Sequence, residues 1–464
     1  RHGEINNLAL PYFVYSLRLS CLPVTLRTES PIRANWPFDV RRLPFYYGWV
    51  IWGFSALGIL ISIPGQTMGM AVFTDYLIEA LHLSRTQLSM AYLIGTVGSS
   101  LFLTRAGRWY DRLGGRVTMA AASAGLAIMV LFISVSDSLA VHFGGGVVVS
   151  FLFITLGYFG VRFLGQGILT NASRNVLLVW FEERRGLVTS ARGMFVSFGF
   201  SVAPLVLAWS IVRAGWHEAL WELAFVCLVF AGIALVFLRD NPRSCGVLVD
   251  GHTHEDQVPV ARLRPSATLD QARRTPVFWL ATLSLGIHSL LGTAVTFHIV
   301  SIFAAAGRSQ TEAFAYFLPT AVFATATNLL CGWLVDKRSL KPFMIVMLGG
   351  FLLGAIGLLH LQHTWGYAAL VVGFGIGGGL WSVTSNLAFI RNFGPLHLGE
   401  ITGLCTSIMV FASAIGPALF SLGLDYFDTY AAALWVCIAA LVLLLGFAFV
   451  VKQSAPNELA NVGV

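Results

Sequence analysis

The chain has 464 residues, of which 56% are hydrophobic and only 11% are charged, and its mean hydropathy is +0.76. A soluble globular protein carries about 25% charged residues, so this composition excludes a water-covered surface and predicts a protein embedded in a lipid bilayer. The formal charge of +7 does not indicate a nucleic-acid partner, because basic residues collect in the cytoplasmic loops of membrane proteins.

The chain starts with Arg1 rather than Met, and residues 1–43 contain the semi-apolar segment LALPYFVYSLRLSCLPV. Arg18 and two prolines interrupt this segment, so we expect a poorly ordered extension rather than a membrane span or a signal peptide. Four of the six cysteines lie in apolar runs, and none has a metal-like spacing. The sequence therefore predicts neither a metal site nor a cofactor.

Twelve stretches are apolar and long enough for a membrane-spanning helix. They are centred in 46–73, 87–106, 117–135, 148–173, 187–211, 219–238, 277–303, 312–333, 343–360, 366–389, 401–424 and 430–451. The polar segment 239–275 divides them into an N-terminal bundle, 44–238, and a C-terminal bundle, 276–451, followed by a cytoplasmic tail, 452–464. Within the polar segment, His252 and His254 fit a solvated loop better than a metal site.

The distribution of basic residues predicts the orientation. With the N-terminus in the cytoplasm, the inner loops hold sixteen lysines and arginines, and the outer loops hold only Arg85, Arg213 and Arg308. The positive-inside rule then places both termini in the cytoplasm. We expect a multi-pass protein of the plasma (inner) membrane, and a monomer.

The two halves share sequence features at constant spacing. Ser84 with Gln87, and Ser309 with Glu312, each fit a capping box at the start of a helix, 225 residues apart. Two further pairs recur at the same offset, and two at an offset of 213: Gly107 with Gly332, Asp111 with Asp336, Gly186 with Gly399, and Pro204 with Pro417. These repeats predict two pseudo-symmetric bundles of six helices, an arrangement of many secondary transporters.

The loop between the second and third spans reads Gly107-x-x-x-Asp111-Arg112-x-Gly114-x-Arg116. It resembles the signature loop of the major facilitator superfamily. Other segments are similar to a bacterial branch near the monocarboxylate and oxalate/formate transporters: Tyr47-Gly48-Trp49, Trp180-Phe181, Arg185-Gly186, Arg239-Asp240-x-Pro242 and Phe393-Gly394-Pro395. The resemblance implies the fold and transport by alternating access. It does not specify a substrate.

The same loop concentrates charge in a chain that has little. We interpret it as a cytoplasmic gate, in which ion pairs close one side of the protein and break when that side opens. Alternatively, the charges only enforce orientation, although this does not explain why Asp111 recurs as Asp336. The gate candidates are Gly107, Asp111, Arg112, Gly114, Arg116, Asp336 and Lys337.

Ionisable residues at membrane depth are candidates for function, and Arg162 is the strongest one here. It favours an anionic substrate, and the alternative is a structural arginine bonded to carbonyls. Pro64 and Gly65 predict a break in the first helix beside polar side chains. The substrate-binding candidates are Arg162, Gln166, Gln66, Thr67, His298, Asn171, Trp381 and Asn386. The eighth span lacks the cation common in carboxylate carriers of the similar branch, which weakens that analogy.

His288 and His298 lie ten residues apart in the seventh span and are candidates for a coupling proton, with His298 ranked first; a buried neutral ring is the alternative. The sequence has no G-x-S-x-G elbow, no H-E-x-x-H and no P-loop, so an enzyme or an ATP-driven pump is not expected. We expect a secondary transporter of a small organic anion, such as a carboxylate, driven by an ion gradient. The alternatives are an exporter of hydrophobic drugs or metabolites and a non-transporting membrane receptor or sensor.

Overall fold

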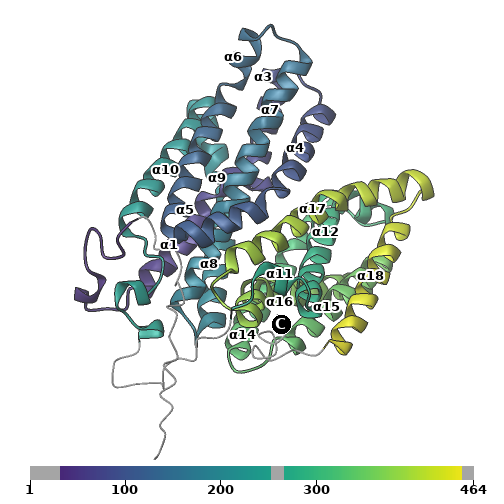
Figure 1. Cartoon of the computed structure of the whole chain (residues 1–464). Coiled ribbons are helices and arrows are strands. Elements are labelled where there is room, and N and C mark those ends of the chain that lie inside the picture. The colour runs from purple at the N-terminus through teal and green to yellow at the C-terminus, as the bar shows by residue number, and fades with distance from the viewer. Residues whose placement is uncertain (1–31, 252–265, 452–464) are drawn as a thin grey trace, which may run out of the picture.

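A computed structural model describes residues 32–251 and 266–451, and the regular elements over these ranges are all helical (Figure 1). Residues 1–31 of the expected N-terminal extension, His252, His254 and the C-terminal tail lie outside the described residues. The rest of the extension, 32–43, packs on the N-terminal half: Val40 is only 3% exposed. Here the fold starts earlier in the chain than we expected.

The N-terminal half holds the elements α1 to α10, and the C-terminal half holds α12 to α18. In the first half these are α1 (Gly48–Ile61), η2 (Ile63–Gly65), α2 (Thr67–Ala71), α3 (Thr74–Leu81), α4 (Arg85–Ser100), α5 (Leu103–Ser134), α6 (Ser136–His142), α7 (Val147–Val161), η3 (Arg162–Leu169), α8 (Thr170–Trp180), α9 (Arg185–Ala214) and α10 (Trp216–Phe237). In the second they are α12 (Pro276–Ala305), α13 (Gln310–Ala315), α14 (Phe317–Val335), α15 (Lys341–Leu359), α16 (Thr364–Phe393), α17 (Leu398–Phe427) and α18 (Ala431–Val450). Short turns flank or connect the halves: η1 (Val40–Arg42), η4 (Arg243–Cys245), η5 (Val249–Gly251) and α11 (Leu269–Ala272).

Over the described ranges, ten helical stretches are long and apolar enough to cross a membrane. The two remaining predicted spans are built from shorter pieces. The first joins α1, η2 and α2, and the second joins α4 to the beginning of α5. The chain turns back within α5 at Gly114, whose φ of +82° suits glycine and few other residues. Twelve spanning segments therefore fit the structure.

Both predicted capping boxes are confirmed. At the start of α4, the Gln87 backbone N–H donates to Ser84 Oγ (3.1 Å), and the Ser84 N–H donates to Gln87 Oε1 (2.8 Å). Ser309 and Glu312 exchange the equivalent bonds at 3.2 and 3.0 Å. Each pair satisfies backbone donors that a helix start leaves open.

Each half has its own hydrophobic core, one built from residues between 40 and 245, the other from residues between 267 and 451 together with Leu178. The halves meet where α4 and α5 pack against α17, and where α9 packs against α14 and α16. Figure 1 shows them diverging toward the end that carries α3 and α6. We call this the open end, and the end where Gly107 meets Gly399 the closed end.

Candidate transport cavity and its closed end

At the closed end, two aspartates of the repeated loops each bind the start of a helix in the opposite half. The Asp111 carboxylate accepts from the backbone N–H groups of Gly399 (2.8 Å) and Glu400 (2.9 Å), in the first turn of α17. The Asp336 carboxylate accepts from Gly186 (2.7 Å) and Leu187 (3.1 Å), in the first turn of α9. A helix N-terminus carries partial positive charge and open N–H donors, so it attracts a carboxylate.

Four glycines let the helices approach this closely. A Cβ atom added to Gly107 would collide with the carbonyl oxygen of Gly399, and one added to Gly186 would collide with the carbonyl oxygen of Gly332. These are the glycines that recur between the halves of the sequence. The two repeat pairs therefore cross over at the closed end: Gly107 meets Gly399, and its repeat Gly332 meets Gly186, which is the repeat of Gly399.

The other charges of the two loops contribute unequally to the contact. Arg108 forms an ion pair across the halves with Glu400 at 2.6 Å. In the C-terminal loop, Asp336 pairs with Arg391 of its own half at 3.1 Å, and burial raises the pKa of its carboxyl group. Arg112 is exposed, and the ammonium group of Lys337 lies over the ring of Trp333 on α14, 4.3 Å from the ring centre.

Arg116 does not take part in the contact between the halves. Its guanidinium donates to the carbonyl oxygens of Leu235 (2.6 Å) and Val236 (3.3 Å) at the end of α10, and to that of Trp36 (2.9 Å). Lys341, 225 residues later, binds the carbonyls of Phe449 and Val451 at the end of α18 in the same way. The sequence places Arg116 among the gate candidates, as a partner of Asp111 or of carboxylates in the other half. The structure differs because α10 exposes free carbonyls that a buried cation can bind.

Between the halves, above the closed end, lies a cavity of about 470 Å³. It is lined by α1, Gln66, α2, η3, α8 and α9 of the first half, and by α12, α16 and α17 of the second. Seven of the eight predicted substrate-binding residues line it: Gln66, Thr67, Arg162, Gln166, Asn171, Trp381 and Asn386.

The predicted helix break and Arg162 form one local structure. After the 3-10 turn Ile63–Gly65, Gln66 has extended backbone angles, which interrupts the first helix. The Gly65 carbonyl accepts from the Arg162 guanidinium at 3.0 Å, and Thr67 Oγ1 lies at 3.5 Å from it. The guanidinium also stacks over the ring of Tyr92, 5.2 Å from its centre. The break thus frees a carbonyl that holds the cation at the cavity wall.

A second arginine of the same span, Arg174, also faces the cavity. Twelve residues of regular α-helix turn through about 1200°, which would leave Arg162 and Arg174 about a third of a turn apart. The segment η3 is a π-helix, which has more residues per turn and so reduces this angle. The local change in helix type therefore brings both cations to one cavity.

Sequence reasoning missed a third arginine in the lining. Arg192 lies on α9, is only 2% exposed, and donates to Ser55 Oγ (3.0 Å) and Asn386 Oδ1 (2.5 Å). It lies inside the predicted span 187–211. Its position at membrane depth, the signal that identified Arg162, could therefore have identified Arg192 too. The acceptors of Arg162 and Arg192 are all uncharged, and the lining found over 32–251 and 266–451 contains no acidic residue.

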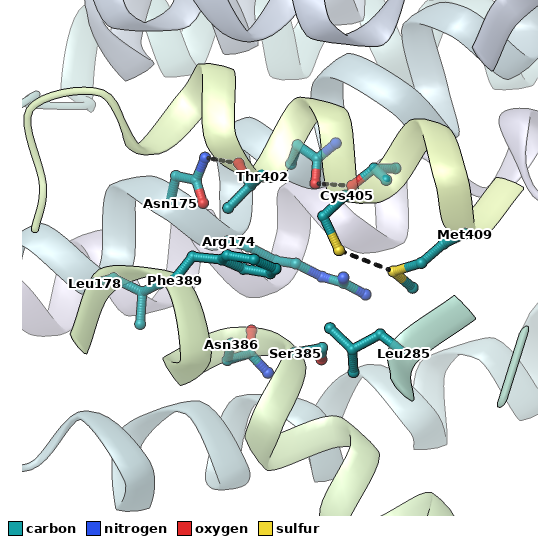
Figure 2. A pocket seen from close by; sticks show the side chains of 12 residues that line it. Arg174, Asn175, Leu178, Leu285, Ser385, Asn386, Phe389, Thr402, Cys405 and Met409 are labelled. Carbon is teal, nitrogen blue, oxygen red and sulfur yellow. Dashed lines mark hydrogen bonds between the residues drawn. The ribbon is translucent and has the colours of Figure 1, made fainter. Parts of the chain in front are cut away.

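Below the cavity floor, a small pocket of about 20 Å³ separates it from the closed end (Figure 2). Two hydrogen bonds one helical turn apart cross between the halves here. Asn175 Nδ2 donates to Thr402 Oγ1, and Thr406 Oγ1 donates to Asn171 Oδ1, both at 3.0 Å. Figure 2 shows the Arg174 side chain between the helices that carry these residues and the helix of Asn386. The floor is therefore polar and held by both halves.

The two candidate histidines lie in different surroundings. His288 lines the cavity and packs against the rings of Phe351 and Trp381. His298 is outside the lining, and its Nε2 lies 3.1 Å from the carbonyl oxygen of Pro417 on α17. Ten residues leave them about 80° apart around a regular helix, enough to give them different neighbours.

The structure has two six-helix halves around a central cavity, and close helix contacts join them at one end. This arrangement is that of secondary membrane transporters. The chain belongs to the major facilitator superfamily: the sequence profile described as Major Facilitator Superfamily matches residues 55–417. No curated protein sequence matches the chain.

Solved structures show the same fold. A bacterial homologue of the iron transporter ferroportin in an outward-facing state is 18% identical, with a TM-score of 0.64 over 86% of this chain and 98% of that one. The proton:xylose symporter XylE bound to 6-bromo-6-deoxy-D-glucose is 16% identical, with a TM-score of 0.62 over 90% and 99% of the two chains. At these identities the likeness concerns the fold.

Proposed function

We propose that this transporter carries a small organic anion, such as a carboxylate, by alternating access. The observation that supports this is the charge of the cavity: Arg162, Arg174 and Arg192 line it, and no acidic residue does in the part of the chain that the structure describes. Buried cations are costly unless an anion or polar groups compensate them. A bound carboxylate would supply the missing negative charge. The guanidinium groups also match its geometry.

The cavity charge also favours an anion over the substrates in the names of the structural neighbours, which are iron and xylose. An iron cation would be repelled by three arginines, and a neutral sugar would leave their charge uncompensated. The same argument disfavours export of cationic drugs. We also propose that this chain is related to the monocarboxylate and oxalate/formate branch of the superfamily. The eighth span lacks the cation that is common in carriers of that branch, and in our proposal the arginines of the fourth and fifth spans take its place.

We further propose that the closed end faces the cytoplasm, since basic residues such as Arg105, Arg108 and Arg112 lie there. Both termini would then be cytoplasmic, in a plasma membrane. In this orientation the structure is open to the outside, and the contacts of Asp111 and Asp336 form the closed cytoplasmic gate. Within this frame the two domains are 44–238 and 276–451.

For a coupling proton we propose His288 rather than His298, because only His288 lines the cavity. His288→Gln is expected to flatten the dependence of uptake on pH, whereas His298→Gln should preserve it. A wild-type pH profile in His288→Gln would exclude this role.

Thermal unfolding of the purified protein with small carboxylates, sugars and cationic drugs tests the substrate class, since a ligand of the folded state raises the unfolding temperature. We expect stabilisation by a carboxylate that is lost in Arg162→Gln and partly kept in Arg162→Lys. Flux of the same compound into proteoliposomes distinguishes a transporter from a sensor, which would bind without flux. Stabilisation by a sugar or a cation alone would refute the anion proposal.

A further inference from the structure

One guanidinium group ties the two halves together at the cavity floor. Arg192 extends from α9 of the first half and donates to Asn386 Oδ1 on α16 of the second half, at 2.5 Å. Its other terminal nitrogen donates to Ser55 Oγ at 3.0 Å, and both Arg192 and Asn386 are nearly buried, at 2% and 8% exposure. This contact is therefore a buried link between domains that alternating access requires to move.

The acceptors of Arg192 are weak partners for a cation. Ser55 offers a hydroxyl and Asn386 an amide, and the Arg192 Nε lacks a hydrogen-bond partner among the described residues. A carboxylate accepts two parallel N–H bonds from a guanidinium, and such charge-assisted bonds are about twice as strong as neutral ones. A carboxylate that reaches this position would displace the amide.

Asn386 is oriented as an acceptor for this arginine. Its Nδ2 donates to the carbonyl oxygen of Ser382, one turn earlier in α16, at 2.6 Å. This bond turns the amide oxygen toward Arg192. The two side chains also line the cavity, so an anion in the cavity can reach them.

We propose that the Asn386 amide oxygen is a stand-in for the substrate carboxylate on Arg192, and that the substrate displaces it and so unties α9 from α16. The inference rests on the proposed anion function. It changes the role expected for Asn386 from a ligand of the substrate to its competitor.

The position of the link gives the displacement a consequence. Arg192 lies seven residues after the start of α9, about 10 Å along its axis. At that start, Gly186 and Leu187 bind Asp336 of the other half. The Arg192–Asn386 link and the Asp336 contact thus both join α9 to the second half, at two points along the same helix. Release of the first leaves α9 held to the second half by the Asp336 contact and by the hydrogen bond from Ser190 Oγ to the Asn328 carbonyl oxygen (3.0 Å), both nearer the closed end.

Two substitutions at one position test the proposal in opposite directions. Asn386→Asp keeps the size of the side chain and places a permanent carboxylate on Arg192, so it should lower the apparent affinity for acetate, oxalate or succinate at least about tenfold. Asn386→Ala removes the stand-in and should leave that affinity unchanged or raise it. Affinity is measured from the rise in unfolding temperature with ligand concentration. Thr293→Asp, which adds the same charge at α12 of the same cavity, controls for general repulsion and should lower affinity less.

The outcomes separate this inference from the proposed function. If both Asn386 variants lose affinity, Asn386 is itself a substrate ligand and the inference is wrong. It is also wrong if Asn386→Asp binds carboxylates as the wild-type protein does. The ligand-free proteins give an independent readout: Asn386→Asp should unfold at a higher temperature than Thr293→Asp, and an equal or lower temperature would overturn the stand-in role. If no carboxylate stabilises the wild-type protein while another compound does, the proposed function fails, and the ligand-free comparison still tests the link.

Discussion

Asp111 and Gly399 stand 288 residues apart in the chain, yet the Asp111 carboxylate accepts the Gly399 backbone N–H at 2.8 Å. Gly399 is also the residue whose carbonyl leaves no room for a side chain on Gly107, one turn before Asp111. The contact is thus both electrostatic and steric, and it joins the halves at the closed end. We had expected ion pairs between side chains here. The structure shows carboxylates that bind helix starts, and the cross-domain ion pair Arg108–Glu400 lies beside them.

Asp111→Asn should slow transport and leave membrane insertion intact. The amide still fits the site but loses the charge that the start of α17 attracts, at a cost of about 1 kcal/mol, or roughly fivefold in the population of the closed-end form. Initial uptake rates in proteoliposomes, normalised to the amount of inserted protein, measure the effect. Asp336→Asn should act similarly, and wild-type rates in both variants would mean that the aspartates serve orientation only.

Gly107→Ala should open the closed end. The added Cβ meets the Gly399 carbonyl, which is backbone and cannot rotate away, so we expect about 1–3 kcal/mol against the closed form. The readout is labelling of a cysteine introduced at Thr402 by a membrane-impermeant thiol reagent, which should become faster from the closed side. Gly378→Ala is the matched control, because its Cβ would meet no atom within 4 Å. Equal labelling rates in the two variants would contradict the steric role of Gly107.

Arg116→Gln should reduce stability rather than gating. The arginine is 1% exposed and binds carbonyl oxygens of its own half, so its loss leaves buried acceptors unsatisfied, at about 1–3 kcal/mol. The unfolding temperature in detergent should fall by several degrees. The surviving folded protein should keep its transport rate. If the variant has normal stability but no longer transports, Arg116 takes part in gating and the prediction is wrong.

A disulfide between α8 and α17 should block transport. Asn175 Nδ2 and Thr402 Oγ1 are 3.0 Å apart across the halves, so side chains at these two positions point toward one another. Oxidation of the double variant Asn175→Cys/Thr402→Cys is expected to stop flux, and reduction to restore it. The single variants serve as controls under the same oxidant. Flux that continues in fully cross-linked protein would mean that the closed end does not open during transport.

Much of the fold could be predicted from the sequence because its determinants are local. Apolar length identifies a spanning helix, and spacing within a turn identifies a capping box, as at Ser84 and Gln87. The repeated residues Gly107, Asp111 and Gly399 likewise stand out as motifs without any knowledge of their contacts. Membership of the superfamily was therefore visible in the chain before its folding was considered.

The tertiary structure alone decided which residues share the cavity and which serve the fold. A π-helical segment rotates Arg174 onto the face of Arg162, and a regular periodicity cannot predict that change. Arg192 faces Asn386 only because α9 packs against α16, and Arg116 turns away from the opposite half because α10 ends beside it. The outcomes for Arg192 and Arg116 depend on contacts between segments more than a hundred residues apart. The local sequence cannot predict which of these distant segments come into contact, because the contacts are determined when the helices pack.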